Sequence, residues 1–175
     1  MAIANSVVTT TRVRKAVIVD SLLLVFIYFI PSLSHAFSVP LYQFEPMRIA
    51  LFVSILLLRN RNNAYILAVT LPLFSFLVAG HPVAVKNVIM GMELLVNVFL
   101  FCKLIDKKVN PFWSCFLSVV ISKIFYYLLK LTAIKTGLLS VGLIDTALYI
   151  QLIVAVSLSL ILWISYNKKG VGSNG

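Results

Sequence analysis

The residues best placed to do chemistry are a carboxylate and an amine, each inside an apolar run. Glu93 lies within VIMGMELLVNVF, residues 88–99, and Lys123 lies in a later run. If these runs cross a membrane, each charge costs about 2.5–3.5 kcal/mol at mid-bilayer and needs a partner inside a helix bundle. At about 1.5 Å per residue from the outer ends, Glu93 lies about 10 Å deep and Lys123 about 12 Å deep. We therefore expect the two opposite charges to meet.

Helical spacing gives both residues polar neighbours, because residues three, four and seven apart share a helix face. On the last apolar run, Asp145 and Tyr149 also share a face near the outer end. We expect a polar pocket that opens outward and is closed toward the cytoplasm by Leu, Val and Phe. The candidate substrate-binding residues are Glu93, Lys123, Asn97, Tyr126, Tyr127, Lys130, Lys86, His81 and Tyr149.

These residues also have a purely structural interpretation. Glu93 and Lys123 could form a buried ion pair that fixes the register of two helices. Tyr126 and Tyr127 could belong to the aromatic belt at a membrane interface, and His81 could be an ordinary loop residue. Asp20 could pair with Lys15 or extend to the interface.

Composition supplies the setting for these side chains. The chain of 175 residues is 61% hydrophobic and 11% charged, against about 45–50% and about 25% for soluble domains. Its net charge of +10 lies in short clusters between apolar runs, which is typical of membrane topology and argues against nucleic-acid binding. We expect one transmembrane domain over 1–175, with a short cytoplasmic segment 1–15 and a disordered tail 170–175.

A membrane span needs about 20 mostly apolar residues. Six runs qualify or nearly qualify: 17–37, 41–58, 64–79, 86–105, 111–131 and 144–166. The sequence therefore predicts an all-α polytopic membrane protein, a six-transmembrane-helix bundle. The second and third runs are short, and the second begins with Glu45 and Arg48, so a re-entrant pair is the alternative.

Loop charges predict the orientation, because Lys and Arg stay cytoplasmic. Every second loop is basic: Arg12, Arg14 and Lys15; Arg59 and Arg61; Lys103, Lys107 and Lys108; Lys168 and Lys169. This alternation places both termini in the cytoplasm. The RNRNN turn at 59–63 is cytoplasmic only if the second and third runs both cross, which favours six full spans.

The N-terminal region has a rival interpretation as a signal peptide. RVRK, the apolar stretch after it and Ser34-His35-Ala36 imitate a charged region, a core and a cleavage site. Asp20 and the length of the apolar stretch argue against cleavage, so we expect the segment to be retained.

No motif for catalysis or metal binding is present in the sequence. Cys102 and Cys115 lie at predicted cytoplasmic helix ends, where thiols stay reduced, and we expect them to be packing residues. An intramembrane hydrolase lacks a nucleophile and base, since Ser34 and His35 adjoin only in sequence. We expect no enzyme activity, no cofactor and no metal.

One stretch resembles a known family. AVTLPLFSFLVAGHP, residues 68–82, followed by MELL, residues 92–95, is similar to the substrate-binding S components of energy-coupling factor (ECF) transporters, the bacterial vitamin-uptake systems. Their pattern is a third helix that contains proline, a Gly-x-Pro turn and a glutamate before leucine on the fourth helix. The resemblance covers about residues 45–130.

The resemblance implies a subunit that captures a small, water-soluble vitamin or related metabolite from outside. Its implied partners are a scaffold T subunit, two ATPase subunits and the lipid bilayer. Of the site residues, only Glu93 and its surroundings match the family motif, and we expect a substrate carboxylate to pair with Lys123 or Lys130. The chain departs from the family at Ala16-x-x-x-Asp20, where many members have Ala-x-x-x-Ala for contact with the scaffold subunit. The alternative is a non-enzymatic membrane scaffold of the cell envelope.

Overall fold

The regular elements of the computed structural model are all helical over the residues it describes, 2–79, 84–140, 142–144 and 146–171. The prediction of an all-α protein is confirmed over this part of the chain. The elements are α1 (Ala2–Phe37), the 3-10 helix η1 (Leu41–Phe44), α2 (Pro46–Leu58), α3 (Arg61–Ala79), α4 (Ala84–Asp106), α5 (Pro111–Lys135) and α6 (Leu148–Val171).

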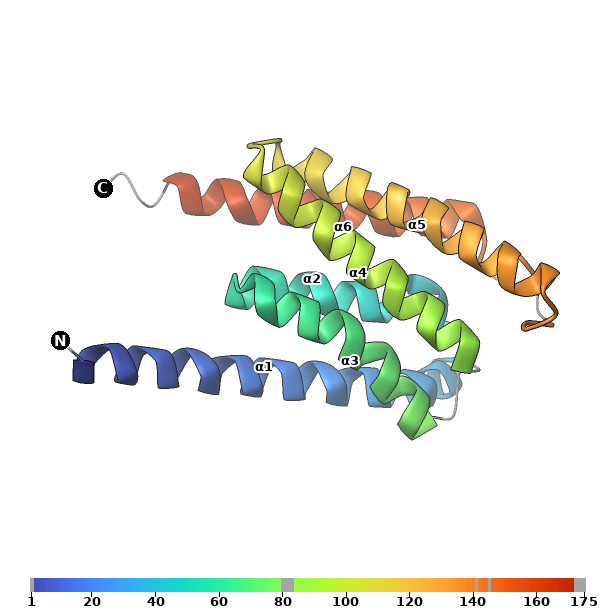
Figure 1. Cartoon of the computed structure of the whole chain (residues 1–175), viewed down its shortest axis with the longest axis horizontal. Coiled ribbons are helices and arrows are strands. Elements are labelled where there is room, and N and C mark those ends of the chain that lie inside the picture. The colour runs from blue at the N-terminus through green and yellow to red at the C-terminus, as the bar shows by residue number, and fades with distance from the viewer. Residues whose placement is uncertain (1, 80–83, 141, 145, 172–175) are drawn as a thin grey trace.

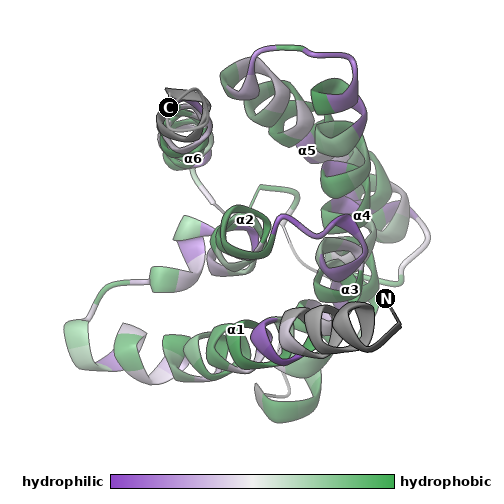
Figure 2. Cartoon of the chain, turned by 90° about the vertical axis from the view of Figure 1, so that its left-hand side faces the viewer, coloured by the Kyte–Doolittle hydropathy of each residue, from purple (hydrophilic) through white to green (hydrophobic). Residues whose placement is uncertain are grey.

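The helices run roughly along one common axis (Figure 1). Viewed along this axis, α2 lies in the middle and the other five helices surround it (Figure 2). Helix α4 packs between α3 and α5, α6 packs on α5 and α2, and α1 packs on α2 and α3. Helix α2, the shortest of the α-helices, therefore lies at the centre of the bundle.

Among the described residues, four stretches are long and apolar enough to cross a membrane: Val13–Phe37, Ala84–Asp106, Pro111–Lys135 and Leu148–Asn167. Their exposed side chains include many large apolar ones, such as Leu22, Leu128 and Ile153. Apolar side chains on the outside of a bundle fit contact with lipid. Helices α2 and α3 are outside this set of four.

The predicted span 41–58 is broken into two pieces at Glu45. This residue adopts the left-handed conformation with φ 54°, and Pro46 follows at the first position of α2. Proline has no N–H to donate and has a φ suited to a helix start, so it begins a new helix. At 13 residues, α2 is about 20 Å long, shorter than the hydrocarbon core of about 30 Å.

Several other predicted boundaries also differ. Residues 2–15, which belong to the predicted short cytoplasmic segment 1–15, form the first part of the long helix α1. Helix α5 runs to Lys135 instead of 131, and α6 begins at Leu148 instead of 144. Helix α6 continues to Val171, two residues into the predicted disordered tail 170–175. The rest of that predicted tail, 172–175, lies outside the described residues.

A dense apolar core joins α2 to the helices around it. Phe52 of α2 and Phe101 of α4 meet edge to face, with ring centroids 5.4 Å apart. Leu71 of α3, Cys115 of α5 and Leu162 of α6 are fully buried in the same core. Cys115 is therefore a packing residue, as predicted.

A polar joint attaches α1 to this core. The Asn63 side chain on α3 donates to Asp20 Oδ1 of α1 at 2.9 Å and to Ser54 Oγ of α2 at 3.2 Å. Asp20 thus has an amide partner. Lys15 instead donates to the Leu57 carbonyl oxygen at 3.3 Å.

Candidate functional site

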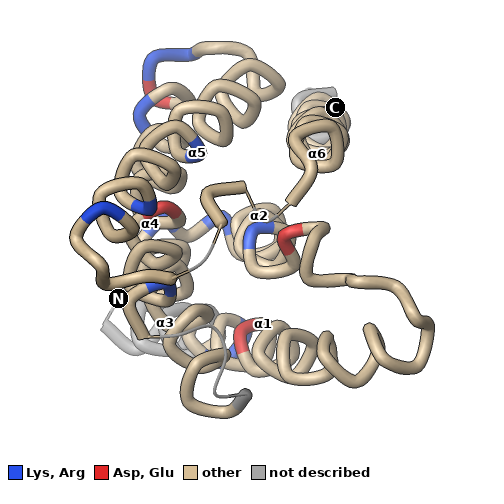
Figure 3. The backbone as a smooth tube through the Cα atoms, turned by 90° about the vertical axis from the view of Figure 1, so that its right-hand side faces the viewer, with Lys and Arg blue, Asp and Glu red and all other residues tan. Residues whose placement is uncertain are grey.

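Four charged side chains meet inside the bundle. Figure 3 shows acidic and basic positions side by side at the start of α2. Lys123 Nζ lies 3.1 Å from Glu93 Oε1, so the predicted pair forms. The same Nζ lies 2.5 Å from Glu45 Oε1. Arg48 donates to Glu45 Oε2 and Glu93 Oε1. Each cation contacts both carboxylates; we call Glu45, Arg48, Glu93 and Lys123 the charge cluster.

The charge cluster is buried and balanced. The Arg48 and Glu93 side chains are 3% and 6% exposed, and Glu45 and Lys123 are 13% and 19% exposed. Arginine stays protonated in proteins, so Arg48 cannot escape the cost of burial by losing its proton. Two carboxylates facing two cations compensate this cost, because a buried charge is tolerated when it is paired and hydrogen-bonded.

Local structure explains how Glu45 and Arg48 reach this place. The break at Pro46 starts α2 within the bundle, and Arg48 lies one turn from Glu45. The Glu45 backbone carbonyl accepts from the N–H groups of Arg48 and Ile49, at 2.9 and 3.1 Å. A carboxylate at a helix N-terminus is also favoured by the helix dipole.

Sequence reasoning missed these two members of the cluster. It treated Glu45 and Arg48 as the charged end of a span. One signal in the sequence could have identified them. Glu45 and Arg48 are opposite charges three residues apart, on either side of Pro46, in a segment too apolar to be a loop. Two charges at such a place need partners as much as Glu93 does.

On α5, the structure decides between the two tyrosines. Lys123 and Lys130 have their ammonium groups 5.1 and 5.9 Å from the Tyr126 ring centroid. Tyr126 and Lys130 are buried, at 8% and 1% exposed, so Tyr126 is not a belt residue facing lipid. The Tyr127 hydroxyl instead accepts from Gln151 Nε2 of α6 at 2.6 Å. Tyr126 therefore lies on the face of the charge cluster, between two amines.

On α4, buried amides extend the polar face. Asn97 is fully buried and donates through Nδ2 to Ser122 Oγ of α5 at 3.2 Å. Within the part of the chain that the structure describes, the carbonyl oxygens of Asn97 and Asn87 accept no hydrogen bond. Lys86, seven residues before Glu93, is partly buried. This face has spare acceptors for a hydrogen-bond donor.

One predicted pocket residue within the described part of the chain lies on the surface. Tyr149 is 66% exposed near the start of α6. Its side chain therefore lies on the surface of the bundle, one residue after α6 begins. His81 and Asp145 lie outside the described residues.

The arrangement favours binding chemistry. Its carboxylates and ammonium groups offer strong, charge-assisted hydrogen bonds in a setting of low dielectric. Among the described residues, no three His, Cys, Asp or Glu side chains gather in a way that could hold a metal ion.

No family model, no curated protein and no solved structure matches the chain. The resemblance to S components therefore depends on the short stretches at residues 68–82 and 92–95 and on the overall pattern of apolar runs.

Proposed function

We propose that the chain is the membrane-embedded substrate-binding subunit of an ECF-type uptake transporter in a bacterial cytoplasmic membrane. It captures a small, water-soluble vitamin or related metabolite from outside for ATP-driven import. The observation that carries this proposal is the charge cluster, with Tyr126 and Lys130 on the same face of the bundle. Ionisable residues inside membrane bundles are costly, and they commonly mark substrate pathways.

The proposal includes six crossings with both termini in the cytoplasm. Lys15 contacts the end of α2, and Arg61 at the start of α3 pairs with Asp106 at the end of α4. Lys15 and Arg61 thus lie at one end of the bundle, which fits the positive-inside rule for a cytoplasmic face. Helix α2 crosses only together with η1 and the turn at Glu45.

The proposed ligand carries a carboxylate and at least one hydrogen-bond donor. Its carboxylate pairs with Lys123, the most exposed member of the charge cluster, or with Lys130 two turns away. Its donor meets Glu93 or the carbonyl oxygen of Asn97. The Tyr126 ring lies between the two amines and offers an aromatic surface for a planar part of the ligand.

Mass spectrometry of small molecules released from gently purified protein identifies the ligand. Binding of that ligand is then measured for Glu93→Gln and Lys123→Met, with the exposed Arg61→Met as the matched control. We expect at least about tenfold weaker binding for the first two, the loss of one charge-assisted hydrogen bond, while the control binds as wild type. Wild-type affinity in both cluster variants would refute the proposed site.

The complete pairing of the charge cluster favours a second candidate, a membrane scaffold of the cell envelope. In that case the four charges only brace α2, α4 and α5. The purified protein would then release no small molecule. Removal of one charge would reduce the amount of folded protein, although the protein has no ligand. Removal of one cation together with one anion would restore folding.

A further inference from the structure

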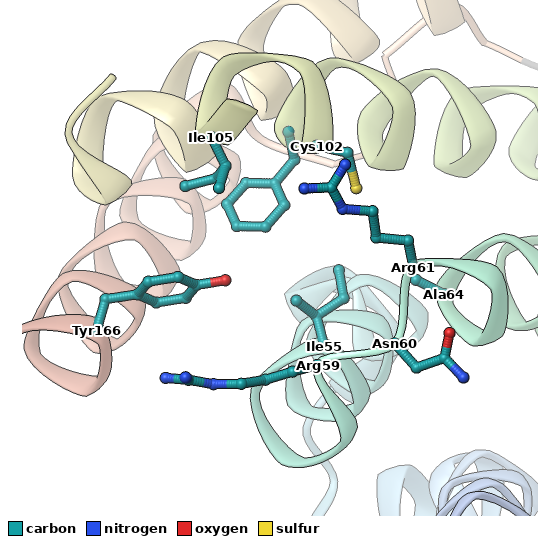
Figure 4. Close-up of a pocket in the computed structure, with 9 residues that line it drawn as sticks. Ile55, Arg59, Asn60, Arg61, Ala64, Cys102, Ile105 and Tyr166 are labelled. Atoms are coloured by element: carbon teal, nitrogen blue, oxygen red, sulfur yellow. The ribbon is translucent and has the colours of Figure 1, made fainter. Parts of the chain in front are cut away.

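A pocket of about 140 Å³ lies between the end of α2, the start of α3 and the ends of α4 and α6. Its floor is apolar, with Ile55, Ala64 and Phe101 all buried. Its rim is polar and comes from Arg59, Arg61, Asn60 and Tyr166 (Figure 4). We call it the arginine pocket; it shares no residue with the charge cluster.

Arg59 is held at this rim by the backbone. It ends α2 in the left-handed conformation, φ 50°, and its N–H donates to the Ile55 carbonyl oxygen at 3.0 Å. Its guanidinium lies 5.3 Å from the centroid of the Tyr166 ring on α6. Among the described residues Arg59 has no carboxylate partner, and its guanidinium lies over the aromatic ring at the exposed rim.

The other charges around the arginine pocket leave it basic. Arg61 is bound by both carboxylate oxygens of Asp106, which neutralises that pair. The nearby turn after α4 adds Lys107 and Lys108. Helix α3, 19 residues long, begins at Arg61, so the positive end of its dipole also lies at the rim.

We propose that the arginine pocket binds a phosphate group. Guanidinium groups bind phosphate through two parallel hydrogen bonds, and Figure 4 shows the Tyr166 hydroxyl pointing into the same space. The apolar floor suits the glycerol and first acyl carbons of an anionic phospholipid, and a free phosphate ester has the same headgroup chemistry. This inference holds for a transporter subunit and for a scaffold, and does not depend on the proposed function.

Cys102 lines the arginine pocket, so chemical labelling of its thiol can report whether the pocket is occupied. The full chain, purified in detergent micelles, is treated with a maleimide while phosphatidylglycerol, phosphatidylcholine or inorganic phosphate is added. The labelling rate at Cys102 is measured by mass spectrometry, and the fully buried Cys115 reports any unfolding. We expect phosphatidylglycerol to slow labelling at least about fivefold, and phosphatidylcholine to have no effect.

Two variants and one control decide the assignment. Arg59→Gln and Tyr166→Phe should each weaken the protection. Lys103→Gln should keep it, because Lys103 is an exposed charge on α4 that lies over the outward-facing Phe99 ring and does not line the pocket. Equal protection by inorganic phosphate would support the pocket with a free phosphate ester as its source. Protection by phosphatidylcholine, or full protection in both Arg59→Gln and Tyr166→Phe, would overturn the proposal.

Discussion

Arg48 and Glu93, 45 positions apart in the chain, form a buried ion pair that joins the start of α2 to the middle of α4. Lys123 of α5 contacts the same carboxylate oxygen of Glu93. One acid therefore holds three helices together. Because charges buried in a bundle must be paired, this contact also fixes where α2 begins relative to its neighbours.

The first prediction concerns Arg48, the more deeply buried of the two cations in the charge cluster. Arg48→Met leaves two buried carboxylates facing Lys123 alone, and we expect a loss of about 3–5 kcal/mol, the usual cost of breaking a buried pair. The measurement is the free energy of unfolding in detergent. Arg61→Met is the matched control, because its pair with Asp106 is about half exposed and contributes little. Equal losses in both variants would mean that burial does not decide the cost.

The second prediction concerns charge balance. Lys123→Met alone leaves an excess negative charge in the cluster and should destabilise the protein. Adding Glu45→Gln restores balance around the remaining Arg48–Glu93 pair, so the double variant should regain most of the lost stability. A double-mutant cycle measures this coupling. Losses that simply add would show that Lys123 and Glu45 do not interact.

The meeting of Glu93 with Lys123 was predictable, because depth and face follow directly from helix geometry. Lys123 lies about 18 Å along α5 from the helix end at Lys135, farther from that end than predicted. The predicted span ended at residue 131, four residues before the observed end of α5, so the predicted distance was too short. The two charges meet all the same, with Lys123 Nζ 3.1 Å from Glu93 Oε1.

The break at Glu45 was not predictable from hydropathy, which averages over a window and cannot register one residue with positive φ. Tyr126 and Tyr127 were equally undecidable, since residues three and four after Lys123 both lie close to its face. Packing against α6 decided the matter, because Tyr127 accepts a hydrogen bond from Gln151. The sequence pattern was sufficient to predict the helices and their polar faces. Which of two adjacent residues points into the bundle depends on tertiary contacts.

The third prediction compares two phenylalanines of α4. Phe101 is 2% exposed against Phe52, and Phe99 is 51% exposed on the outside. Phe101→Ala opens a cavity in the core and should cost about 2 kcal/mol, mainly from lost packing, because lipid and core are equally apolar. Phe99→Ala should change the free energy of unfolding far less. Similar losses in the two variants would contradict the assignment of inside and outside faces.

The fourth prediction concerns the two thiols. Cys102 is partly exposed and Cys115 is completely buried. In folded protein a maleimide should label Cys102 and leave Cys115 unmodified, because burial denies the reagent access. Denaturation should make both react, as mass spectrometry can show. Labelling of Cys115 in folded protein would contradict the packing of α5 against α2 and α6.

The last prediction concerns how α1 is attached. Asn63 donates to Asp20 of α1 and to Ser54 of α2, so it is a joint between three helices. Asn63→Ala should cost about 1 kcal/mol, typical of hydrogen bonds between membrane helices, and should speed hydrogen exchange in α1. Asn62→Ala is the control, since Asn62 is exposed and its backbone N–H alone bonds to Asn60. Faster exchange in α4 and α5 as well would point to general loosening, whereas unchanged exchange in α1 would show that apolar packing holds that helix.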